Sequence, residues 1–253
     1  MAMTCMRCGV AALLIFLYGR AKHLSLFRLS SAQIVGAISY FVMAASIAVA
    51  MKFTTAASAI ALQYTAPVFV ALLSATVLRE RILTRDVLQM LVVIGGVFLC
   101  IDFAGCGTGS GEQTLLGNAA ALLSGAAYAV FIVAGRIQKE TPLGSILIGN
   151  LFGFFATLPW LVDMPRTGEN LLLGSIFGLF CGGLGFILFA EAIRRIEALP
   201  AVLIASLDPV LNPVWVLLFI GEWPSVTVAI GAAIVIAAIF VGSLFDTLRP
   251  RHT

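Results

Sequence analysis

Long apolar runs are the feature that most constrains how this chain can fold. A helix that crosses a bilayer needs about 20 mostly apolar residues, and nine stretches of that kind follow one another along the sequence. They lie approximately at 3–19, 32–51, 56–78, 85–103, 115–137, 142–162, 170–193, 199–220 and 225–245. The runs are continuous and lack a two-residue alternation, which favours helices over barrel strands. We therefore predict an all-α membrane protein with nine transmembrane helices.

The composition excludes the main soluble alternatives. Of the 253 residues, 61% are hydrophobic and 11% are charged, whereas a soluble domain is about 45–50% apolar and about 25% charged. The net charge of +3 is small, and the basic residues lie in short loops, so no patch for nucleic acid is present. The expected surroundings are the lipid bilayer of the cell membrane, and the expected partner is a small-molecule substrate. Whether the chain forms a homodimer stays open.

The basic residues fall unequally on the two sides of the predicted spans. Arg7, Lys52 and Arg166 lie on one side, and the other 12 of the 15 Lys and Arg residues lie on the opposite side. Lys and Arg collect in cytoplasmic loops. We therefore expect the more basic side, and with it the C-terminus, to be cytoplasmic.

A repeat is visible around two prolines. Pro67 precedes Glu80 by 13 residues, Pro209 precedes Glu222 by 13 residues, and the two prolines are 142 residues apart. The same offset places the last spans on the first four, while the span 115–137 has no partner. The simplest interpretation is a five-plus-five protein whose first helix is absent from this chain. Because each repeat has an odd number of spans, the second copy is inverted, as in many secondary transporters.

These segments resemble a known family. Ala66-Pro67-Val68-Phe69, Leu207-Asp208-Pro209-Val210 and Gly221-Glu222 are similar to the EamA branch of the drug/metabolite transporter superfamily. The resemblance implies a ten-helix carrier of amino acids, other metabolites or drugs, often outward, with both termini in the cytoplasm. It divides the chain into a truncated first repeat, 1–104, and a second repeat, 115–246. In the family the first helix lines the central cavity.

Asp208 is the sharpest functional signal. It follows the predicted start of its span at Leu199 by nine residues, which is about 13–14 Å at 1.5 Å per residue. A carboxylate at that depth costs about 2.5–3.5 kcal/mol on insertion scales. It could couple transport to protons or bind a substrate amine, or it could be a structural acid bonded to freed backbone groups.

Further polar and aromatic residues share its face or its repeat position. Helical spacing puts Ala205, Asp208, Asn212 and Trp215 on one face, and this face suits a cavity wall. The offset maps Ala205 onto Gln63, which has Tyr64 beside it. We predict substrate contacts from these groups and from the mid-span Tyr128, although Gln63 and Asn212 could equally join helices and Tyr128 could simply pack. Other polar residues within the spans include Tyr40, Asn118, Ser124 and Asn150.

Proline and glycine add two expectations about the helices. Pro67, Pro209 and Pro213 lie inside spans, and each should kink its helix because it removes a backbone donor. Gly174, Gly178 and Gly182 recur every four residues, which lets another helix approach closely. We interpret this face as a packing surface, with a sliding surface for alternating access as the alternative.

Signatures of enzymes are not found in the sequence. A phosphate-binding loop is absent, and His23 and His252 lie in a loop and in the tail. We therefore expect no enzyme, no cofactor and no metal site. An intramembrane enzyme acting on lipid head groups would need a second deep ionisable group beside Asp208. A truncated membrane protein that does not transport is the remaining alternative.

Overall fold

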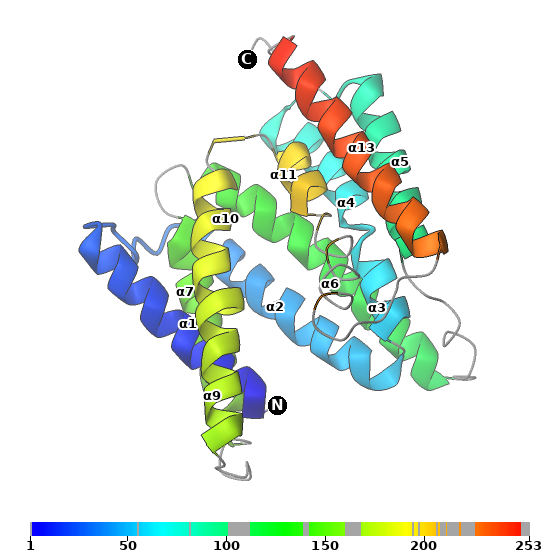
Figure 1. Cartoon of the computed structure of the whole chain (residues 1–253). Helices are drawn as coiled ribbons and strands as arrows, with labels where there is room; N and C mark the ends of the chain where they lie inside the picture. Colours follow the sequence, from blue (N-terminus) through cyan, green and yellow to red (C-terminus); the bar gives the residue numbers. More distant parts are fainter. Residues whose placement is uncertain are drawn as a thin grey trace. The chain divides into compact units, whose positions relative to one another are not determined.

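The computed structural model describes most of the chain, and the described part is helical (Figure 1). The described residues are 2–54, 56–80, 82–100, 112–138, 142–159, 168–193, 195–196, 198–205, 207, 211, 218 and 226–248. The α-helices are α1 (Ala2–Ala21), α2 (Ser31–Phe53), α3 (Ala56–Gln63), α4 (Ala66–Leu73), α5 (Thr84–Cys100), α6 (Glu112–Ile137), α7 (Pro142–Thr157), α9 (Gly168–Phe177), α10 (Gly185–Ile193), α11 (Ala198–Ala205) and α13 (Val226–Leu248). Two π-helical segments, η1 (Ser74–Leu78) and η3 (Gly178–Leu184), continue α4 and α9.

Several of these helices have the length and composition of membrane spans. Among the described residues, four segments are long and apolar enough to cross a bilayer: Thr4–Ala21, Ser31–Phe53, Thr114–Ile137 and Leu171–Ile193. Shorter apolar helices cover Ala66–Leu78, Pro142–Thr157 and Ala229–Val241. This agrees with the all-α membrane class. The count of nine spans and the inverted repeat remain predictions.

The chain packs as two compact units. Unit 1 contains Met1–Ala45 and Val130–Glu197, and unit 2 contains Ser46–Ala129 and Ala198–Thr253. Each unit therefore takes segments from both stretches that we assign to sequence repeats, 1–104 and 115–246. That assignment stays a prediction. The helices α2 and α6 each contribute one part to each unit.

In unit 1, α1 packs closely against η3 through glycine. A Cβ atom on Gly178 would lie 2.8 Å from Cβ of Val10, and one on Gly182 would lie 2.8 Å from Cβ of Ala11. Real Cβ atoms do not approach so closely, so hydrogen at these two positions is what allows the contact. The predicted glycine face is therefore a packing surface at Gly178 and Gly182. The helix α7 also packs against α1.

A buried polar network joins α2, the end of α6 and the start of α7 in unit 1. Gln138 donates from Nε2 to the backbone carbonyls of Ala32, at 2.9 Å, and Ala134, at 3.1 Å. The Ser145 hydroxyl shares its proton between Oε1 of Gln138, at 3.0 Å, and the carbonyl of Gln33, at 2.9 Å. All three side chains are buried. In an apolar bundle such bonds hold helix ends in register, because an unpaired amide would be costly.

The cap of α2 belongs to the same network. The Gln33 amide accepts a bond from the backbone N–H of Leu29 at 2.8 Å and donates to the carbonyl of Leu26. The Ser30 hydroxyl accepts from the N–H of Gln33 at 3.2 Å, which satisfies one of the free donors at the helix start. The link between α1 and α2 is therefore held against the start of α2 by the Gln33 side chain.

In unit 2, α5 and α13 lie side by side (Figure 1). Gly96 of α5 faces Val235 and Gly231 of α13, and the Gln89 amide donates to the carbonyl of Ala238 at 3.2 Å. A second contact of small side chains joins α2, α3 and α6. The members of that contact are Ala50, Ala59 and Ala121, with Ile47, Leu62 and Ala120 packed against them.

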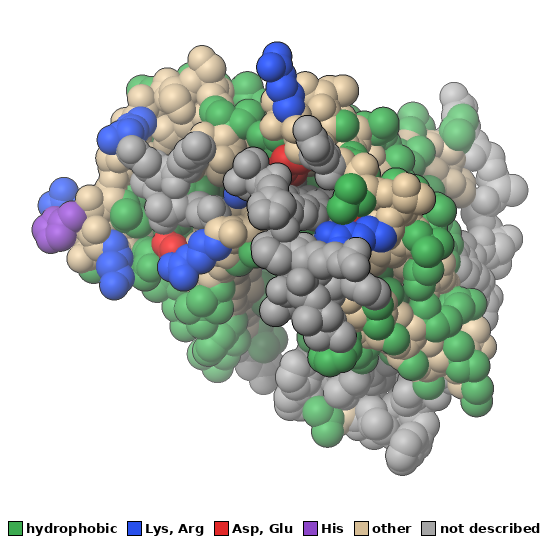
Figure 2. Space-filling view, turned by 90° about the horizontal axis from the view of Figure 1, so that it is seen from above, with side chains coloured by type: hydrophobic (Ala, Val, Ile, Leu, Met, Phe, Trp, Pro, Cys, Tyr) green, Lys and Arg blue, Asp and Glu red, His purple; other side chains and the backbone are tan. Residues whose placement is uncertain are grey.

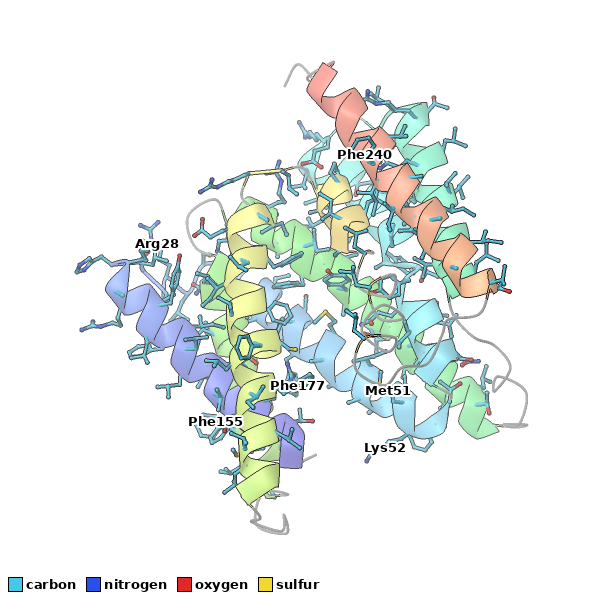
Figure 3. The ribbon with its side chains drawn as sticks, viewed as in Figure 1. Arg28, Met51, Lys52, Phe155, Phe177 and Phe240 are labelled. Carbon is cyan, nitrogen blue, oxygen red and sulfur yellow. The ribbon has the colours of Figure 1, made fainter. Side chains whose placement is uncertain are left out.

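The surface is apolar along the helices and charged at helix ends. Phe155, Phe177 and Phe240 are 64%, 51% and 69% exposed (Figure 3), as expected for side chains that face lipid. Arg28 lies just before α2 and Lys52 in its last turn (Figure 3). Figure 2 shows several Lys and Arg side chains near the histidine.

Replacing Gly96 by alanine should destabilise the α5–α13 contact. The new Cβ would lie 2.6 Å from Cγ2 of Val235 and 3.1 Å from the carbonyl oxygen of Gly231, and overpacking of this kind costs about 1–3 kcal/mol. Gly95 is the matched control, because a Cβ there meets no atom within 4 Å. We expect Gly96→Ala to lower the apparent Tm of the detergent-solubilised protein. Gly95→Ala should leave it equal or higher. A Tm for Gly96→Ala as high as that for Gly95→Ala would contradict the packing.

Candidate functional site: a broken span and a buried arginine

The predicted span 56–78 is interrupted near its middle. α3 ends before the turn Tyr64–Thr65, and α4 begins after it, with Pro67 in the first turn. Proline lacks the N–H that a continuous helix would use, and its ring clashes with a carbonyl one turn earlier. The expected kink at Pro67 is confirmed. Pro209 and Pro213 lie outside the described residues.

Thr65 satisfies part of the backbone that the break exposes. Its hydroxyl donates to the carbonyl of Leu62 at 2.7 Å, and its N–H donates to the same carbonyl at 3.2 Å. The N–H of Tyr64 still reaches the carbonyl of Ile60 at 3.0 Å. A broken helix is tolerated in a membrane only where such groups find partners or line a wet cavity.

Helix α6 provides the polar surface against which the break packs. The Gln63 amide donates from Nε2 to the Ser124 hydroxyl at 2.8 Å, and Ser124 is fully buried. The next residue is Gly125, where a Cβ would come within 3.0 Å of the Gln63 carbonyl oxygen. A larger residue at 125 would therefore hold the backbone of α6 away from the break.

Three of the six predicted substrate contacts lie in this region. Gln63 and Tyr64 are at the break, and Tyr128 lies one turn beyond Ser124 on the same face of α6. All three predicted residues are half-buried. Both tyrosines are already engaged in interactions within the protein.

The other three predicted contacts, Asp208, Asn212 and Trp215, lie outside the described residues. The helix that precedes them, α11, packs against α4 and α5 in unit 2. The end of α11 at Ala205 corresponds, by the offset of 142, to Gln63. The grouping of all six residues around one site stays a prediction.

A second polar cluster lies in unit 1 around Arg7. The Arg7 guanidinium lies near enough to the Tyr40 side chain for the two to interact electrostatically, and its Nη2 lies 3.5 Å from Sγ of Cys8. The Tyr40 hydroxyl lies 3.4 Å from Oδ1 and 3.2 Å from Nδ2 of Asn150. Asn150 also donates to the carbonyl of Ile146 at 2.9 Å. A chain of polar groups thus runs from α1 through α2 to α7.

Aromatic rings enclose the middle of this chain. The Tyr40 ring meets Phe131 edge-on, with centroids 5.4 Å apart, and Phe186 at 5.1 Å. Phe189 stacks on Phe131 at 6.2 Å. The Tyr40 side chain is 1% exposed. Its ring is fixed by these edge-to-face contacts, so its hydroxyl holds one position toward Arg7 and Asn150.

No sequence motif connects Arg7, Tyr40 and Asn150. The distribution of basic residues assigns Arg7 only to the less basic side of the membrane, and Tyr40 and Asn150 are polar groups within predicted spans. The signal that could have found the cluster is a lone cation inside the apolar run 3–19, because such a charge needs a partner in the bundle. Tyr40 and Asn150 are separated by 110 residues, so sequence spacing cannot show that they meet.

Comparison with known proteins identifies the family. The model of the EamA-like transporter family matches residues 1–101 and 115–244. One solved crystal structure is similar over 99% of this chain and 89% of its own, with a TM-score of 0.84 and 19% identity. That likeness shows a shared fold.

Three relatives are named as uncharacterized transporters. One from Clostridium kluyveri is 28% identical over 206 residues, which is 78% of this chain and 65% of the relative. Two from Archaeoglobus fulgidus are 27% and 26% identical over 81% and 70% of this chain. These matches cover 73% and 63% of the two archaeal proteins. The chain thus spans about two thirds of the length of the relatives that it matches.

The family match extends over both long stretches of the chain, and the helices have the apolar composition of membrane spans. This chain is therefore an integral membrane protein that belongs to the EamA-like transporter family.

Proposed function

We propose that this chain is a secondary carrier that exports a small metabolite, such as an amino acid or a drug-like solute, by alternating access. The observation that carries the proposal is the break in the span 56–78, which packs against the polar face of α6 at Gln63 and Ser124. Discontinuous helices form the substrate and ion sites of many secondary transporters. Membership in a family of transporters supports a carrier over an enzyme acting on lipid head groups.

The broken helix is chemically suited to bind a polar solute. A continuous helix in lipid uses all of its interior backbone groups internally, and therefore has none to offer. The turn at Tyr64–Thr65 interrupts this pattern, and the amide and phenol side chains beside it add donors and acceptors. We propose that Gln63, Tyr64 and Tyr128 contact the solute there.

We assign proton coupling to Asp208. A carboxylate in a mainly apolar span is costly when charged, so its protonation responds to whether the site is open to water. The sequence repeat places Asp208 beside the equivalent of the α3–α4 break, and α11 packs against α4. Asn212 and Trp215, one and two turns farther on, complete the proposed site.

The proposed setting is the cell membrane, with the C-terminus and the basic loops in the cytoplasm. The proposed carrier has an inverted five-plus-five plan in which a further helix precedes the span 3–19. The unequal division of Lys and Arg between the two sides supports the orientation.

Asp208→Asn should abolish or uncouple transport. An amide keeps the size of the side chain but cannot release a proton, so accumulation driven by a pH gradient should be lost. The measurement is a screen of metabolite uptake and efflux in vesicles, repeated with and without a pH gradient for each transported solute. Asp246→Asn, near the end of α13, is the control. Full pH-driven accumulation by the Asp208 variant would eliminate the proton role.

Gln63→Leu should slow transport about tenfold or more, because one lost hydrogen bond of about 1.4 kcal/mol at a binding site corresponds to a factor of ten. Gln89→Leu is matched to it. That change also removes an amide from a helix, where the bond goes to Ala238 of α13, and should reduce stability without changing the transport rate more than about twofold. Equal transport losses in the two variants would mean that Gln63 acts only in packing.

The inverted repeat predicts opposite locations for two turns. In a background without native cysteines, Ile82→Cys reports on the turn after Glu80, and Ser225→Cys reports on the turn after Glu222. We expect a membrane-impermeant maleimide to label position 225 in intact cells and position 82 only after permeabilisation. Labelling of both positions from the same side would refute the inversion.

A further inference from the structure

Arg7 is a cation inside a membrane span. It lies in the second turn of α1, within the candidate span Thr4–Ala21, and its side chain is half-buried. Placing a guanidinium in hydrocarbon is costly, and such residues face the bundle interior and bind a partner. The group that binds Arg7 therefore bears on what unit 1 does.

The protein supplies few acceptors to this guanidinium. An arginine side chain has five N–H donors. Among the described residues, the acceptor within hydrogen-bond distance is the weakly accepting sulfur of Cys8, and the Tyr40 side chain interacts with Arg7 electrostatically. No carboxylate of the described chain forms an ion pair with Arg7. Within the described part of the chain, most of these donors have no oxygen acceptor.

The Tyr40–Asn150 pair is arranged to hold Arg7 in place. The Tyr40 hydroxyl donates to Oδ1 of Asn150 at 3.4 Å, and Nδ2 of Asn150 donates to the Ile146 carbonyl at 2.9 Å. Arg7 interacts electrostatically with the Tyr40 side chain. Asn150 is fully buried, and rings on both sides fix Tyr40. A preorganised guanidinium loses little entropy on binding, and its flat fork of donors suits two oxygen atoms of one anion.

The opposite helix approaches Arg7 closely through two glycines. A Cβ on Gly178 would lie 2.9 Å from the Arg7 carbonyl oxygen, and one on Gly182 would lie 3.5 Å from Cγ of Arg7. Both glycines belong to η3, a π-helical segment. π-Helical turns inside α-helices are frequent at functional sites. Without side chains at these two positions, the backbone of η3 lies directly against α1 at Arg7.

We propose that Arg7 recognises an oxyanion on the transported solute, with Tyr40 and Asn150 as positioning residues. The substrate class is then a small organic carboxylate or phosphate. The inference rests on the proposed carrier function and narrows its substrate. A lipid phosphate group offers the same chemistry, so the experiment has to separate solute from lipid.

The test compares two probes of equal shape, sodium benzoate and neutral benzamide. The full chain is purified in dodecyl maltoside, which contains no phosphate, and binding is measured by the shift in apparent Tm with probe concentration. We expect benzoate to raise the Tm and benzamide to have little effect. Arg7→Gln should raise the apparent Kd for benzoate at least about tenfold, because charge-assisted bonds are lost. Arg7→Lys should retain part of the affinity.

Arg20→Gln is the matched control, because Arg20 lies on the same helix and is exposed; its benzoate affinity should match the wild type. Tyr40→Phe keeps the ring and removes the hydroxyl that orients Arg7. We expect Tyr40→Phe to reduce the preference for benzoate over benzamide several-fold, although Arg7 is still present. This variant therefore tests the site even if Arg7→Gln does not fold.

Two outcomes overturn the proposal. One is a benzoate response that is absent, or that is equal in the wild type and Arg7→Gln. The other is stabilisation that depends on Arg7 only in nanodiscs of phosphatidylglycerol and not with benzoate in detergent, which would assign Arg7 to lipid. Failure of the carrier function would look different, because it would remove transport of every solute while leaving equilibrium binding of benzoate intact.

Discussion

The cost of an unpaired polar group in hydrocarbon governs this structure. Water is not available inside a bilayer, so backbone N–H and C=O groups must bond within the protein. The described chain meets this requirement mainly through helices, and it departs from them in a few defined places. At the break between α3 and α4, the Thr65 hydroxyl donates to the backbone carbonyl of Leu62, and the Gln63 side chain donates to Ser124 of α6. The same requirement explains the shared bonds of Gln33, Gln138 and Ser145.

Glycine and small side chains determine where helices approach each other. Apolar side chains gain little from leaving lipid for a neighbouring helix, so contact depends on close packing and interhelical hydrogen bonds. Gly178 and Gly182 bring η3 onto α1, Gly96 brings α5 onto α13, and Gly125 brings α6 onto the broken span. The last of these contacts sets the distance between the break and the polar side of α6.

The sequence predicts the helices well because membrane spans are defined by local composition. The runs 3–19 and 32–51 match α1 and α2 within two residues at each end, and Pro67 gave the break because proline acts through its own backbone. Tertiary contacts are less accessible. The pairing of Gln63 with Ser124 depends on how α3 meets α6, and the meeting of Arg7, Tyr40 and Asn150 depends on three helices. The count of Lys and Arg on each side of the membrane does not distinguish Arg7, because it treats every cation as a loop residue.

The π-helical segment η3 has a consequence for the aromatic wall of unit 1. A π turn accommodates about one more residue than an α turn, and each residue advances an α-helix by about 100° at 3.6 residues per turn. The extra residue therefore rotates the phase of α10 relative to α9, and with it the direction in which Phe186 and Phe189 project. A homologue that is one residue shorter here would still cross the bilayer, but those two rings would turn away from Tyr40. Within this one span, the π-helical turn therefore determines the direction of the rings, whereas the length of the apolar run determines whether the helix crosses the bilayer.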